Sequence, residues 1–250
     1  MNKLVALSAL ALLPVTAAIA QEAKPDYTVT GNLTVASDYR FRGASQTGRS
    51  PTLQGGIDFA HSSGFYLGNW NSNVESGLYR GASLEMDVYG GYKFAAGPVN
   101  LDIGGLYYYY PSGGDKDGLE KIDQGELYIG ASFSYFTIKF SYGLTDFFGA
   151  GDGTDVDTDG NYYIDLGFAY DLGQGWGLNA HYGYQYVKNA EDLDWDADNV
   201  SDYKIGITKD VNGWLLGLSV VGTSDKDFAL TDNDRDGGKT GVVLSVAKTF

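Results

Sequence analysis

Apolar and polar residues alternate along most of the chain, and this period of two constrains the fold more than any other feature. Between Val99 and Tyr109, for example, Leu101 and Ile103 alternate with Asn100 and Asp102. Successive side chains of a β-strand point to opposite faces, so the pattern predicts strands with one apolar and one polar face. Beyond the N-terminal segment no stretch approaches 18 consecutive apolar residues, which excludes a helical membrane protein.

The alternation predicts twelve strands, at residues 28–43, 51–61, 64–74, 83–94, 99–110, 124–134, 136–147, 161–172, 175–188, 200–211, 213–224 and 239–250. Tight turns alternate with long polar connections, at 44–50, 75–82, 111–123, 148–160, 189–199 and 225–238. Short turns at one end, long loops at the other and an even number of strands are typical of outer-membrane barrels.

The fold class that this pattern favours is all-β, a transmembrane antiparallel up-and-down β-barrel with short periplasmic turns and long extracellular loops. In hydrocarbon an unpaired backbone polar group costs several kcal/mol, so a sheet crosses a bilayer only when it closes on itself. The apolar face of each strand then meets lipid and the polar face lines the interior. A secreted soluble β-sandwich with calcium loops is a third reading, which the regular sorting of loop lengths disfavours.

The two ends of the chain both indicate export. Residues 1–20 combine a positive start at Lys3, an apolar run and the small residues Ala18 and Ala20, which is typical of a cleaved signal peptide. We expect 21–27 to be a short periplasmic segment and 28–250 to be the barrel. The last strand ends in Phe250, a terminal aromatic of the kind by which the barrel-assembly machinery recognises its clients; Lys248 departs from the usual apolar residue there.

Composition excludes several classes of function. The net charge of −15 argues against a nucleic-acid partner, because the phosphates would be repelled. With no Cys, the chain has neither disulfides nor thiolate metal ligands. Only His61 and His181 are present, and nothing places a serine beside either, so we expect no enzyme.

Several motifs resemble the TorF-type porin family of proteobacteria, formerly catalogued as a conserved family of unknown function. The motifs are the run from Ser37 to Thr47 (SDYRFRGASQT), PTLQGGID at 51–58, GFYLGNWNSNV at 64–74, EMDVYGGY at 85–92 and the closing Lys248-Thr249-Phe250. The likeness covers most of the mature chain and is densest in its first half. It implies an outer-membrane barrel and a channel, and it brings no catalytic residues.

Charged residues on the polar faces are the candidates for a pore lining. These are Asp38, Arg40, Arg42, Glu85, Asp87, Lys93 and Lys139. Opposed charges inside a barrel can set an ion preference at a constriction. Interior salt bridges that fill a narrow barrel are the other interpretation, since buried charges need partners.

The long loops are rich in Asp. Two pieces repeat the D-x-D-x-D-G opening of a calcium loop: one contains Asp155, Asp157 and Asp159, the other Asp232, Asp234 and Asp236. Both lack the Glu expected at the twelfth position, so an EF-hand is rejected and weak Ca²⁺ binding is retained as a hypothesis beside plain solvated loops. No other cofactor is expected.

The sequence therefore predicts a porin-like channel in the outer membrane of a Gram-negative bacterium, passing small hydrophilic solutes or ions by diffusion. The alternative is a closed surface barrel whose acidic loops bind divalent cations, lipopolysaccharide or another ligand. We expect outer-membrane lipid and lipopolysaccharide as surroundings.

Overall fold

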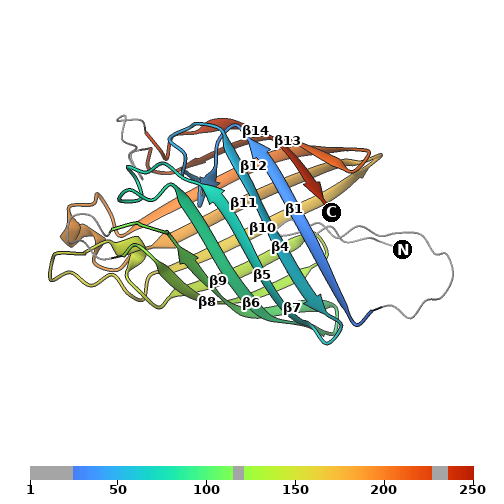
Figure 1. Ribbon diagram of the computed structural model, residues 1–250, viewed down its shortest axis with the longest axis horizontal. Coiled ribbons are helices and arrows are strands. Elements are labelled where there is room, and N and C mark those ends of the chain that lie inside the picture. The colour runs from blue at the N-terminus through green and yellow to red at the C-terminus, as the bar shows by residue number, and fades with distance from the viewer. Residues whose placement is uncertain (1–24, 115–120, 227–235) are drawn as a thin grey trace.

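Twelve long antiparallel strands form a closed barrel in the computed structural model, which describes residues 25–114, 121–226 and 236–250 (Figure 1). The strands are β1 (Tyr27–Ala36), β4 (Thr52–His61), β5 (Phe65–Asn73), β6 (Leu84–Ala96), β7 (Val99–Tyr109), β8 (Gln124–Phe133), β9 (Phe136–Gly143), β10 (Tyr162–Gly173), β11 (Trp176–Tyr186), β12 (Asn199–Val211), β13 (Trp214–Thr223) and β14 (Gly241–Thr249). Neighbours in sequence pair with each other, and β14 pairs with β1 to complete the ring. The predicted fold class is confirmed.

Short and long connections lie at opposite ends of the barrel, as the sequence predicted (Figure 1). The turn between β12 and β13 has positive φ at Asn212 and Gly213, the conformation that joins two strands most tightly. Tyr27 pairs with His61, and the backbone of Phe250 bonds to Gly31, so the first and last described strands begin and end at the turn end.

The outer face carries the apolar half of the alternation. Leu127, Ile129 and Ile205 are each more than half exposed. A water-soluble domain rarely exposes large apolar side chains around its whole circumference. At the turn end, the ammonium of Lys248 lies 5.5 Å from the centroid of the Trp214 ring, and Lys209 lies similarly over Trp176. Long basic side chains beside Trp suit a membrane–water boundary, which accounts for Lys248 in an otherwise apolar row.

Two predicted strand boundaries are wrong, and the other strand limits agree within two residues. The strand predicted at 28–43 ends at Ala36, and the chain then turns inward into a hairpin of β2 (Arg40–Phe41) and β3 (Ala44–Ser45). The strand predicted at 136–147 ends at Gly143 and is followed by the short helix η1 (Phe147–Gly149). A second short helix, η2 (Ala190–Leu193), lies in the loop before β12.

The inward turn has a local cause that alternation does not reveal. Asp38 accepts hydrogen bonds from the hydroxyls of Ser45 and Thr47, and these side-chain contacts replace the backbone hydrogen bonds of a continued strand. Residues 1–20, the expected signal peptide, lie outside the described residues. Within the described parts of the chain, no helix is long and apolar enough to span a membrane.

Candidate channel constriction

The hairpin of β2 and β3 lies across the interior of the barrel. Tyr39, just before it, donates to Glu85 on β6, while Gly43 at its tip packs against Asp202 on β12. β6 and β12 are six strands apart in either direction around the ring, so they face each other across it. A segment that touches both walls within five residues must pass through the lumen.

The tip of the hairpin requires glycine. Arg42 and Gly43 both have positive φ, 45° and 80°, which makes the connection a tight two-residue turn. A Cβ on Gly43 would stand 2.6 Å from the Cβ of Asp202 and 2.7 Å from the carbonyl oxygen of Gly222. The backbone therefore reaches the far wall at a distance that no larger residue permits.

Arg42 fastens this tip to two further strands. Its guanidinium donates to the carboxylate of Glu126 on β8, at 2.6 Å, and to the amide oxygen of Gln185 on β11. It also lies 4.3 Å from the centroid of the Tyr163 ring on β10. Burial alone would lower the pKa of Arg42, but the Glu126 carboxylate, Tyr108 and Tyr163 together outweigh burial and raise it, so the guanidinium stays charged.

The near side of the hairpin is held by tyrosines. Tyr39 and Tyr110 donate to the two oxygens of Glu85, at 2.6 and 2.8 Å. Burial, followed by the Glu85 charge, raises the pKa of both phenols well above its ordinary value, so they remain donors. From the loop side, Phe148 covers Phe41 and Tyr108 with edge-to-face contacts.

The seven predicted pore-lining residues separate into two groups. Asp38, Arg40, Arg42, Glu85 and Asp87 come together at the level of the hairpin, where Arg40 pairs with Asp38. Lys93 and Lys139 face the interior nearer the turn end. Lys93 lies 3.9 Å from Asp102 and over the Tyr66 ring, and Lys139 lies over the Tyr128 ring.

Sequence reasoning missed the residues that receive the hairpin tip. Glu126 and Gln185, which accept from Arg42, and Asp202, which lies against Gly43, are all on polar faces of predicted strands, and that position was the available signal. Their convergence on the tip depends on register and on the inward path of the hairpin, which the alternation does not encode.

His181 lies on the inner wall beside the hairpin tip. Its Nδ1 is 2.8 Å from Asp165 and its Nε2 is 2.6 Å from Asp202, which also accepts from Tyr163. Because carboxylates occupy both ring nitrogens, neither is available to take a proton from a nucleophilic hydroxyl. His61 lies in an exposed turn with Ser63.

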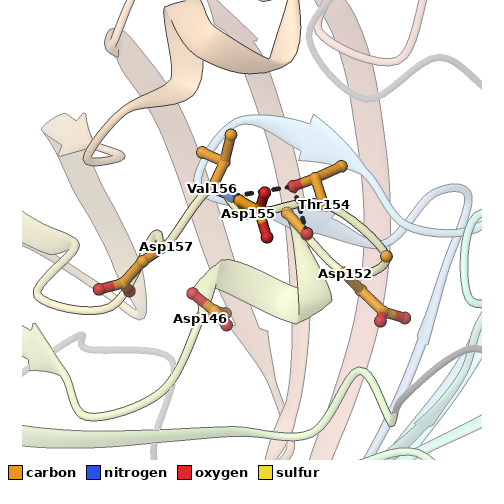
Figure 2. A pocket seen from close by; sticks show the side chains of 8 residues that line it. Asp146, Asp152, Thr154, Asp155, Val156 and Asp157 are labelled. Atoms are coloured by element: carbon orange, nitrogen blue, oxygen red, sulfur yellow. Dashed lines mark hydrogen bonds between the residues drawn. The ribbon is translucent and has the colours of Figure 1, made fainter.

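The loop acids do not converge on a cation in the part of the chain that the structure describes. Asp146, Asp152, Asp155 and Asp157 line an open depression of about 280 Å³. Figure 2 shows that their carboxylates point in different directions. Asp146 accepts from Thr158, and Asp152 pairs with Arg80. Among the described residues no group of three acidic or His side chains has the spacing of a metal site.

Of the two predicted calcium loops, the structure describes the first fully and the second only in part. Lys188 lies 3.1 Å from both Asp157 and Asp159, so an ammonium occupies the space between these carboxylates. Asp232 and Asp234 lie outside the described residues, and Asp236 lies just beyond that gap. Ca²⁺ binding by these loops stays a prediction.

A family model described as a bacterial protein of unknown function (Gcw_chp) matches residues 20–250. The chain belongs to this family. A comparison with curated protein sequences gives no match. Membership extends over the whole barrel, including the hairpin and the closing strand, and it carries no stated activity.

Solved structures with the same architecture include two small porins. A structure of KdgM porin in complex with disordered oligogalacturonate superposes with a TM-score of 0.52 at 7% identity, covering 89% of this chain and 98% of that one. A structure of NanC porin gives a TM-score of 0.56 at 7% identity, with the same coverage of both chains. At these identities the likeness shows the fold alone: a 12-stranded closed barrel of the small-porin type.

Proposed function

We propose that this protein is an outer-membrane channel, of the kind the TorF-type resemblance implies, through which small hydrophilic solutes or ions diffuse. The observation that carries the proposal is the polarity of the inner wall, which stays charged from the turn end to the hairpin inside an apolar outer belt. A barrel with no aqueous role has little reason to place charged rows inside.

The charge of the wall supports a preference for cations and uncharged solutes. Inward-facing acids of the twelve barrel strands are Asp58, Glu85, Asp87, Asp102, Glu126, Asp165, Asp171, Asp202 and Asp210; inward-facing bases of these strands are Lys93, Lys139 and Lys204. The hairpin adds Arg40 and Arg42, each of which is paired with an acid. Rings of acidic side chains favour cations in pores. A polyanion such as the oligogalacturonate bound to KdgM would meet like charge here, so we propose a different class of solute.

The test is reconstitution of the purified protein. In planar bilayers we expect stepwise conductance, and a salt gradient should give a reversal potential of cation-selective sign. Liposomes containing the protein should swell in isosmotic solutions of small uncharged sugars. Folded protein, identified by its heat-dependent gel shift, that gives neither conductance nor swelling would refute the channel.

The packing of the hairpin supports a second candidate, a closed surface barrel whose loops bind the ligand. Tyr39, Arg42 and Gly43 are fixed to three walls, and Phe148 covers them from the loop side. Shortening the loops at 144–161 and 187–198 separates the candidates, since a channel should still conduct while a loop-binding protein should lose its ligand.

A further inference from the structure

Asp87 is a buried carboxylate with an unpaired oxygen among the residues that the structure describes. It faces inward from β6, between Trp70 on β5 and Tyr108 on β7, and is 8% exposed. Its Oδ1 is buried and has no hydrogen-bond partner among the described residues. Buried polar groups in folded proteins are nearly always paired, so this one requires an explanation.

The neighbouring carboxylates differ from Asp87 in this respect. Glu85 receives two phenolic hydrogen bonds, from Tyr39 and Tyr110. Glu126 receives the guanidinium of Arg42 and the amide of Gln124. Both carboxylates lie close enough to Asp87 to act on it by repulsion. The hairpin therefore donates hydrogen bonds to Glu85 and Glu126, and it donates none to Asp87 among the described residues. The charges that act on Asp87 are those of the two other carboxylates.

A carboxylate in this position is stable when a counterion or a proton neutralises it. A divalent metal would need a dense set of oxygen ligands, and no group of three acidic or His side chains with metal spacing is found among the described residues. A small monovalent cation needs fewer protein ligands and keeps part of its water.

We propose that Asp87, in the field of Glu85 and Glu126, is a binding subsite for a monovalent alkali cation at the level of the hairpin. The inference deepens the proposed channel and rests on it for its role, since the hairpin crosses the lumen at this level and a permeating cation would pass beside it. The subsite itself is a property of the folded barrel and can be tested without ion flow.

The first experiment measures thermal unfolding in detergent micelles, in potassium chloride and in N-methyl-D-glucamine chloride of equal ionic strength. The bulky organic cation cannot enter the subsite. We expect the wild type to unfold at a higher temperature in potassium, and D87N to unfold at the same temperature in both salts, above the wild type in N-methyl-D-glucamine. D192N, which removes an exposed loop charge, should respond to potassium like the wild type.

Two outcomes overturn the subsite. A wild type that is insensitive to the choice of cation would mean that a proton neutralises Asp87. A D87N variant less stable than the wild type in both salts would mean that the carboxylate has a structural partner. Glutamate at this position, in D87E, should keep the potassium response, because the charge is retained.

The second experiment measures reversal potentials in a potassium chloride gradient. Removing one charge about 4 Å from a permeating ion should lower the ratio of potassium to chloride permeability about fivefold. D192N should keep the wild-type ratio. Conduction with unchanged selectivity in D87N would refute the subsite and leave the channel standing. Failure of the wild type to conduct would refute the channel, and the unfolding measurement would still decide the subsite.

Discussion

The interior has two levels that are built by different means. Toward the turn end, tyrosine rings lie flat on the wall over glycines: Tyr66 over Gly91, Tyr128 over Gly104. Toward the loop end, the hairpin and the tyrosines around Glu85 fill the cross-section instead. Only side chains of the wall itself occupy the first of these levels among the described residues, whereas a single loop crosses the other.

The hairpin that obstructs the lumen is therefore separable from the barrel wall. A cross-strand pair in which a ring covers a glycine belongs to the barrel itself, and it cannot be removed without loosening the sheet. The hairpin belongs to the connection between β1 and β4, whose facing ends, Ala36 and Thr52, are paired directly. A tight turn could therefore join the two strands.

The largest effect should come from removing the hairpin. We predict that replacing residues 39–47 with a four-residue Gly-Ser turn raises single-channel conductance several-fold, because the lumen loses the segment that crosses it. Planar-bilayer recordings measure this, and the heat-dependent gel shift checks folding. Unchanged conductance in the folded variant would place the narrowest point of the lumen away from the hairpin.

Unfastening the hairpin at its tip should have the next largest effect. R42A leaves the buried Glu126 carboxylate without its ion pair, which costs about 3 kcal/mol in comparable sites. We expect faster hydrogen exchange at the amide of Gln46, which bonds to Tyr39 within the hairpin, and a noisier open-channel current.

R42K is the control for charge. Lysine keeps the positive charge but cannot reach Glu126 and Gln185 with one rigid fork, so exchange should be intermediate. Equal exchange rates in the wild type and R42A would show that the aromatic contacts alone hold the hairpin.

Adjacent glycines on β7 test the level nearer the turn end. A Cβ on Gly104 would stand 2.5 Å from the Tyr128 hydroxyl and from the carbonyl oxygen of Gly90, whereas at Gly105, on the outer face, the nearest atoms are 3.5 Å away. We predict that G104A lowers the free energy of unfolding by about 1–3 kcal/mol. G105A should change it by less than about 0.5 kcal/mol. Urea titration in detergent micelles measures both, and equal losses would contradict the role of the ring-over-glycine pairs.

The alternation predicted the barrel strands because each strand carries the pattern in its own sequence: one face meets an apolar solvent and the other a polar interior. It failed at 37–43, where Tyr39 and Phe41 keep the period of two while Asp38 binds Ser45 and turns the chain inward. The alternation of that segment belongs to a hairpin in the lumen, closed by a two-residue turn, and not to a lipid-facing strand.

The sequence indicated which charged residues face the interior, but not which of them contact one another. Charges on polar faces could be identified as interior, and Glu85 and Asp87 are. These contacts depend on strand register and on the path of the 15-residue loop 37–51. This loop brings Arg42 to Glu126, which lies 84 positions away in the sequence. No local pattern encodes a contact of that separation.

The smallest effect concerns the loop end outside the barrel. The backbone N–H of Asp159 and the ammonium of Lys188 lower the pKa of Asp157. Since this pKa is depressed in the folded state, the contact stabilises the loops above the ordinary Asp value near 4 and is lost as pH falls through the lower, folded value. We predict that hydrogen exchange in loops 144–161 and 187–198 accelerates, relative to intrinsic rates, as pH falls below about 4.

Replacing Lys188 tests the same contact at neutral pH. K188M should accelerate exchange in these two loops at about pH 7 and reduce the additional acceleration in acid, because the hydrogen bond from the Asp159 backbone remains, while K121M, which alters an exposed lysine elsewhere, should behave like the wild type. Strand amides should be unaffected in both variants, because the ion pair is exposed and only links one loop to the other. Acid-dependent exchange that is as large in K188M as in the wild type would assign the effect to the backbone hydrogen bond of Asp159 alone, and the salt bridge would then contribute nothing to the order of the loops.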